Sequence, residues 1–189
     1  MCGCVDAGGI KVLQSGAAAG ALWFYGIQRN GLCLLCDLAE DPAVAEAVVE
    51  AGAVKVLLDC LHPTCIEHKE ACLAAHALAQ LAATSQGGRG IAATPGNITK
   101  LLKALSATYK RCSEEAGLTF HGLSLCLFRL ARNEDCSRAV RSAGGVPAYV
   151  KAMVDAGLDE QQVRSELRDR GGGRGSPLTW REHTVNNLG

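Results

Sequence analysis

Apolar residues recur along this chain at the spacing of an amphipathic helix, in several separated copies. Within each copy they fall at positions i, i+3, i+4 and i+7, which places one apolar stripe along a helix of about three turns. The first copy keeps only Ile10 and Leu13 of this stripe. The complete copies are Val54, Leu57, Leu58 and Leu61; Ile98, Leu101, Leu102 and Leu105; and Val146, Tyr149, Val150 and Met153.

A second, longer apolar stripe follows these copies and predicts a longer helix each time. Small residues, chiefly alanine, alternate with leucine along it, so neighbouring helices can approach closely. Each stripe is too small a core to be stable alone, and the helices must therefore stack on one another. The stripes are Leu32, Leu35, Leu38 and Ala39; Ala71, Ala74, Ala75, Leu78, Leu81 and Ala82; and Phe120, Leu123, Ser124, Leu127, Leu130 and Ala131.

A short third helix is predicted between each long helix and the next medium one. Asp41-Pro42 is a start signal, because Asp accepts hydrogen bonds from free helix amides and Pro suits the first helical position. A helix over 43–50 follows it, and residues 133–142 form the corresponding segment. The middle copy, 85–93, is rich in glycine, so we expect a shorter or looser helix there.

A glycine-containing phrase opens each medium helix. It begins at residues 7, 51, 95 and 143, so the spacings are 44, 44 and 48 residues. A Leu-Ala phrase at 38, 81 and 130 recurs out of phase with it, at spacings of 43 and 49. We expect the glycine to free the backbone for a sharp corner between helices. The phrases are Ala7-Gly8-Gly9-Ile10, Ala51-Gly52-Ala53-Val54, Pro95-Gly96-Asn97-Ile98 and Ala143-Gly144-Gly145-Val146.

This order of short helix, glycine corner, medium helix and long helix resembles the armadillo repeat. The segments 45–58 and 72–82 look most like that family's consensus, and the resemblance covers residues 5–157. It implies an all-α, right-handed superhelical solenoid of about three armadillo units, partial at both ends. The HEAT repeat, the nearest alternative, has two helices and lacks the glycine corner.

In the armadillo family the long helices line a concave groove that holds extended peptides or other protein chains. The resemblance therefore implies a scaffold or adaptor that binds a protein partner and is not an enzyme. In the importin-alpha branch, a Trp and an Asn one turn apart on each long helix grip a basic localisation peptide. That ladder is absent here: the Trp position holds Cys33, His76 and Leu125, and the Asn position holds Asp37, Gln80 and Arg129. Its absence argues against this import role.

The same alignment predicts which side chains face the groove. They are polar, carry both signs of charge and keep helical spacing on the side away from the core stripe. A solvated helix face would look similar for any one residue, but as a group we favour binding. The predicted partner-binding residues are Arg29, Asp37, Lys69, His76, Gln80, His121 and Arg129, with Cys33, Cys72 and Leu125 on the same face.

Composition narrows the partner and the compartment. The 189 residues have zero formal net charge and are 48% hydrophobic, so a folded core is expected and nucleic acid is not an expected partner. No apolar run is long enough for a membrane span, and no membrane partner is expected. Ten cysteines without a secretory signal indicate reduced thiols in the cytoplasm, the nucleus or another intracellular location.

Three motifs suggest other chemistry. Cys33-Leu34-Leu35-Cys36 has the spacing of a redox pair but lies within an apolar helix, so we interpret both cysteines as core. The glycine-rich segment 87–90 follows no strand, and we interpret it as a connector rather than a phosphate loop. No cofactor is predicted. The alternative function is a structural zinc-binding module or a nucleic-acid-associated module on the same fold. The candidate zinc ligands are His62, Cys65, His68, Cys72 and His76.

The ends of the chain differ from its centre. The solenoid is predicted over 1–157, residues 158–170 could form a polar capping helix, and 171–189 are glycine-rich and expected to be disordered. Exposed terminal repeats could also drive self-association. The incomplete first repeat suggests a fragment or short isoform of a longer armadillo protein.

Overall fold

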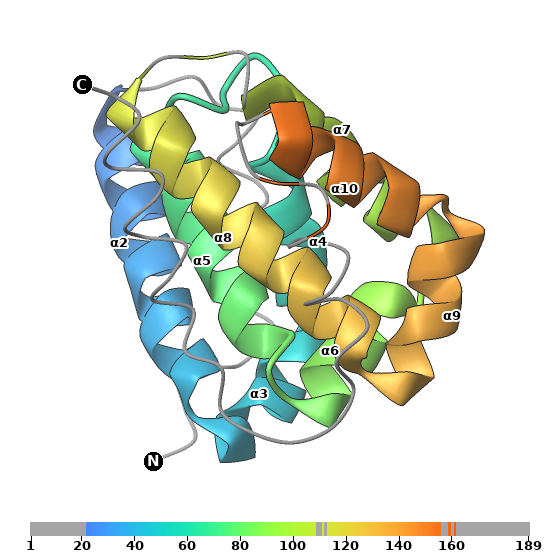
Figure 1. Ribbon diagram of the computed structural model, residues 1–189. Coiled ribbons are helices and arrows are strands. Elements are labelled where there is room, and N and C mark those ends of the chain that lie inside the picture. The colour runs from blue at the N-terminus through green and yellow to red at the C-terminus, as the bar shows by residue number, and fades with distance from the viewer. Residues whose placement is uncertain (1–21, 109–110, 112, 156–158, 160, 162–189) are drawn as a thin grey trace.

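The computed structural model describes residues 22–108, 111, 113–155, 159 and 161, and these residues are helical without a strand among them. The predicted first medium helix, nearly all of the capping helix over 158–170 and the tail over 171–189 lie outside the described residues. The helices, labelled in Figure 1, are α2 (Leu22–Glu40), α3 (Pro42–Glu50), α4 (Ala53–Asp59), α5 (Lys69–Leu81), α6 (Ser85–Ala92), α7 (Pro95–Thr108), α8 (Glu114–Arg132), α9 (Glu134–Ser142) and α10 (Gly145–Asp155).

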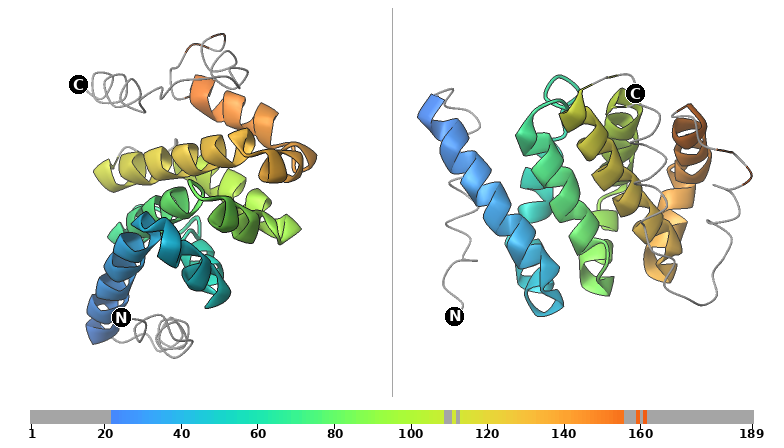
Figure 2. Two further views of the ribbon diagram at one scale, coloured as in Figure 1. Left: turned by 90° about the horizontal axis from the view of Figure 1, so that it is seen from below. Right: turned by 60° about the vertical axis from the view of Figure 1, so that its left-hand side comes forward.

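The helices stack in three rows, and each row holds one kind of helix. The long helices α2, α5 and α8 contact one another in turn, as do the short helices α3, α6 and α9 and the medium helices α4, α7 and α10. Figure 2 shows the long helices side by side as one layer, with α2 at one edge of the molecule and α9 and α10 at the other. The order long, short, medium therefore repeats along the chain, and the arrangement is compatible with an α-solenoid.

The core lies between the rows, and the predicted apolar stripes face it. Leu57, Leu78, Leu101 and Leu127, one from each of four helices, are all at most 2% exposed. The alanines of α5 are buried as well. Among the stripe residues that the structure describes, only Leu38, Ala131 and Val146 are partly buried, and they lie on the first or last described helix of their rows. The helical periodicity was therefore a sufficient guide to the core.

The corners between short and medium helices confirm the glycine prediction at two positions of three. Gly52 has φ 85° and Gly144 has φ 69°, a left-handed conformation that favours glycine. At the third corner α7 already begins at Pro95, and Gly96 lies within its first turn without a positive φ. There the side-chain amide of Asn97 donates to the carbonyl of Ile91 (3.0 Å), so a side chain satisfies the end of α6.

The short helices begin at the predicted caps. The Asp41 carboxylate accepts from the amide of Ala43 (2.9 Å), and Pro42 is the first residue of α3. Asn133 caps α9 by accepting from the amide of Asp135 (3.0 Å). These contacts satisfy amides at the first turn that have no partner within the helix.

The interpretation of residues 87–90 as a connector is wrong, since they lie inside α6. Thr84 caps this helix by accepting from the amide of Gly87 (2.9 Å). A Cβ at Gly90 would come within 2.3 Å of Cγ1 of Val49 on α3, and one at Gly88 within 3.2 Å of the Cys136 sulfur on α9. Glycine is thus present because α6 packs closely between α3 and α9, and this packing offsets its poor helix propensity.

The second medium helix is shorter than predicted. α4 ends at Asp59, although Leu61, the last residue of its apolar stripe, is buried beyond the helix end. Pro63 explains why the helix does not continue, because a proline disfavours helical backbone at the residue before it, which is His62. Residues 60–68 then cross to α5 as a turn that buries Ile66.

Candidate binding face of the long helices

One side of the row α2, α5 and α8 covers the core, and the other side carries the predicted groove residues. We call this second side the long-helix face. The structure buries none of the ten residues predicted to lie there. Exposed are Arg29, Cys33, Asp37, Lys69 and His76, and half-buried are Cys72, Gln80, His121, Leu125 and Arg129.

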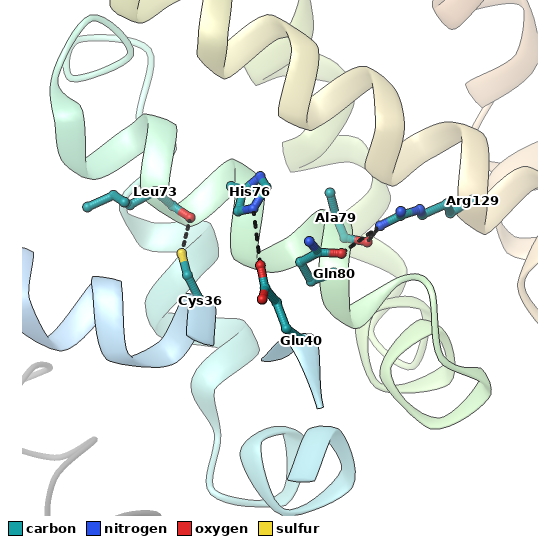
Figure 3. A network of polar contacts seen from close by, with 7 residues as sticks. All are labelled: Cys36, Glu40, Leu73, His76, Ala79, Gln80 and Arg129. Atoms are coloured by element: carbon teal, nitrogen blue, oxygen red, sulfur yellow. Dashed lines mark hydrogen bonds and ion pairs between the residues drawn. The ribbon is translucent and has the colours of Figure 1, made fainter. Parts of the chain in front are cut away.

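Arg129 links α8 to the end of α5. Its Nη1 donates to the backbone carbonyl of Ala79 and to Oε1 of Gln80, the latter at 3.1 Å (Figure 3). The neighbouring carbonyls of α5 have backbone partners, since Leu78 accepts from Ala82 and Gln80 from Ala83. Arg129 therefore supplies the donor for a carbonyl that the ending helix leaves open.

The charge of Arg129 also suits this place. Burial lowers the pKa of its guanidinium, and the nearby Cys126 thiol opposes this effect, yet an arginine in a protein stays charged. A cation at the C-terminus of α5 complements the helix dipole. Both protons of Nη1 are used by Ala79 and Gln80, so Nε and Nη2 keep donors for water or a bound carboxylate. The side chain is thus a structural cap that could still contact a partner.

A second polar contact joins α2 to α5. Nε2 of His76 lies 4.0 Å from Oε1 of Glu40, and the two side chains are half or more exposed. An exposed pair at this distance adds little to stability. Glu40 was not among the predicted face residues, although it follows Asp37 by three positions and so shares its side of α2. It makes the α2 end of the face acidic.

The CxxC sequence divides between the face and the core. Cys36 is buried and donates from its thiol to the carbonyl of Leu73 (3.1 Å; Figure 3). Burial, followed by the charges of Cys33 and Asp37, raises the pKa of Cys36 to about 12, so it remains a thiol at neutral pH. Cys33 is exposed, and its assignment to the core is wrong although it lies only about 60° around the helix from Cys36.

Leu118 is a face residue that the sequence reasoning missed. It is 52% exposed on α8, and it holds the place of Lys69 when the long helices are aligned on their Leu-Ala phrases. Leu125 lies two turns further along the same side and is half-buried. The alignment on the Leu-Ala phrases was the signal for Leu118, which lies seven residues before the predicted face residue Leu125. The α8 part of the face is therefore apolar beside its arginines.

The proposed zinc ligands are dispersed. Cys72 and His76 are one turn apart on α5, but Nδ1 of His62 lies 2.8 Å from the Thr64 hydroxyl, in the turn before α5. The Cys65 sulfur is 3.5 Å from the same hydroxyl. Within the part of the chain that the structure describes, no three His, Cys, Asp or Glu side chains come close enough together to hold a metal ion.

Two further findings bear on the kind of protein this is. None of the helices in the described ranges is both long and apolar enough to cross a membrane. Comparison with protein-family models gives no match for this chain, and comparison with curated proteins gives none either.

Proposed function

We propose that this chain is an armadillo-type repeat protein that binds another protein, or an extended peptide, on its long-helix face. The observation that carries the proposal is the row of three long helices with polar and partly apolar side chains on the side away from the core. The regular order of short, medium and long helices supports the armadillo assignment, as do the glycines with positive φ at Gly52 and Gly144.

The chemistry of the face suits a peptide with mixed side chains. Asp37 and Glu40 make the α2 end acidic, whereas Arg129 and Arg132 make the end of α8 basic. Leu118 and Leu125 add apolar surface, which contributes most to affinity when a partner side chain covers it. Because the face is an open surface rather than a closed pocket, we propose a scaffold or adaptor and not an enzyme.

A binding experiment with matched variants tests this function. The face variant combines Lys69→Glu with Leu118→Glu, and the control combines Lys103→Glu with Val154→Glu on α7 and α10. Each pair reverses one exposed lysine and places a charge on one exposed apolar residue. Proteins captured from a cell lysate are identified for wild type and for both variants, after circular dichroism shows equal helicity.

Binding on the long-helix face predicts partners that the control retains and the face variant loses. The same partners with all three proteins would overturn the assignment of the face. Partners lost equally by both variants would point to a general charge effect.

A further inference from the structure

α2 exposes an apolar residue at a position that the other long helices bury. When these helices are aligned on their Leu-Ala phrases, Leu34 corresponds to Ala77 on α5 and Cys126 on α8. Leu34 is 45% exposed, whereas Ala77 and Cys126 are 0% exposed. Cys126 lies one turn after Gly122, whose Cα packs against Ala75 of α5, so this position faces the preceding long helix. No long helix precedes α2 among the described residues.

The short helices show the same open edge. Counted from their caps, Ala47 of α3 corresponds to Gly90 of α6 and Ala139 of α9. Gly90 packs against Val49 of the preceding short helix, and Ala139 is partly buried, whereas Ala47 is exposed. Among the residues that the structure describes, the side of α2 and α3 that carries Leu34 and Ala47 is therefore a stacking surface without a neighbour, and we call it the leading edge.

The opposite side of the molecule has the complementary surface. On α6, Arg89 pairs with Asp135 of the following helix α9 at 3.3 Å, and its counterpart on α9 is Arg138. Val49 of α3 contacts α6, and its counterpart on α9 is Arg141. Arg138 and Arg141 are both exposed, and this correspondence assigns them to the side of α9 away from α6. We call this side the trailing edge.

The two edges carry opposite charge. Residues 40–50, around α3, include Glu40, Asp41, Glu46 and Glu50 and no basic residue. Residues 132–142, around α9, include three arginines, against Glu134 and Asp135, and Asp135 is already paired with Arg89. Glu50, Arg138 and Arg141 form no ion pair with any other described residue.

We propose that the leading edge binds the trailing edge of a second copy of this chain, so that copies stack head to tail and continue the rows of helices. In this arrangement Leu34 is covered by α8 of the other copy, as Ala77 is covered by α2. Arg141 lies over Ala47, beside Glu50, and Arg138, the counterpart of Arg89, lies over Ala43, the counterpart of Asp135. Such an interface is heterologous, and it extends into chains of copies unless the rotation closes a ring.

Mixing two edge variants tests the head-to-tail arrangement. The leading-edge variant Leu34→Glu keeps an intact trailing edge, and the trailing-edge variant Arg138→Glu, Arg141→Glu keeps an intact leading edge. Sedimentation velocity of the full-length wild type at rising concentration should show dimers and larger species, which added salt weakens. Each variant alone should associate more weakly by about tenfold or more. An equal mixture should form dimers and nothing larger, because only one productive interface remains.

A matched substitution controls for the added charge. Lys103→Glu makes the same reversal of charge as each trailing-edge substitution, at an exposed residue of the middle medium helix α7, and should leave association unchanged. A wild-type chain that stays monomeric at all concentrations overturns the proposal. It is also overturned if the trailing-edge variant associates as well as wild type, since that result indicates a symmetric contact through Leu34.

Discussion

Arg129 of α8 and Gln80 of α5 hold the same place in successive repeats, and their side chains are hydrogen-bonded to each other at 3.1 Å. A residue that could contact a partner therefore also joins two repeats. Since Arg129 in addition donates to the open carbonyl of Ala79, its removal should affect folding as well as binding.

Arg129→Ala should lower the free energy of unfolding by about 1 to 3 kcal/mol, because it leaves a partly buried carbonyl without its charged donor. Urea denaturation followed by circular dichroism measures this change. Arg138→Ala, at an exposed arginine without an ion pair among the described residues, should change stability by no more than about 0.5 kcal/mol. Equal effects of the two substitutions would argue against a capping role for Arg129.

Gly122→Ala should destabilise the protein, whereas Gly117→Ala on the same helix should not. A Cβ at Gly122 would lie 2.9 Å from Cβ of Ala75 and 3.1 Å from the backbone nitrogen of His76, while one at Gly117 has nothing within 4 Å. We expect a loss of about 1 to 3 kcal/mol from overpacking at Gly122 and a gain of up to about 1 kcal/mol in helix propensity at Gly117. Thermal and urea unfolding of both variants provide the comparison.

The corner glycines allow a similar test of backbone conformation. Gly52→Ala places a side chain at φ 85°, which should lower the free energy of unfolding by about 1 kcal/mol or more. Gly96→Ala, within the first turn of α7 and with open space around it, should be neutral or stabilising. A loss at Gly96 as large as that at Gly52 would contradict the difference between the two corners.

Stability should fall as the pH rises above about 9. Burial raises the pKa of both Cys36 and Cys126 from 9.0 to about 12, so the folded state holds protons that the unfolded state releases. The contribution of each protonated thiol to stability is complete below its pKa in the unfolded state. It is lost as the pH rises from that pKa to the pKa in the folded state, at up to about 1.4 kcal/mol per pH unit for each thiol. Urea unfolding at pH 8 and at pH 10 measures the loss.

The double variant Cys36→Ala, Cys126→Ala supplies the reference for this pH dependence, because tyrosine and lysine also titrate in the alkaline range. It should lose less stability than wild type between the two pH values. An unchanged slope would mean that neither buried thiol determines the alkaline limit.

The sequence was sufficient to predict the helices and most of the core, because the stripes have strict helical periodicity and the caps Asp41 and Asn133 act locally. Predictions that depended on a neighbouring repeat were less successful. The segment 87–90 has poor helix propensity and is helical because α6 packs against Val49 and Cys136. Propensity read along one segment contains no information about that packing.

The long-helix face also combines features that depend on nearby residues with features that depend on distant ones. Its positions followed from helical spacing, but the capping role of Arg129 depends on where α5 ends, fifty residues earlier in the chain. Cys33 and Cys36 appeared equivalent in an apolar stretch, and only the position of α5 separates the exposed thiol from the buried one. The exposure of Leu118 likewise depends on which side of α8 meets its neighbours.

α5 contacts a long helix on each side, and its buried residues are mostly alanine: Ala71, Ala74, Ala75, Ala77 and Ala79 are all 0% exposed. Helix axes separated by such small side chains lie near the short end of the usual range of about 8–10 Å. A larger residue on one side of α5 would spread the helices there and bend the row, which would change the curvature of the surface above it. The spacing at which this protein would present side chains to the proposed partner is thus determined by methyl groups beneath the long-helix face.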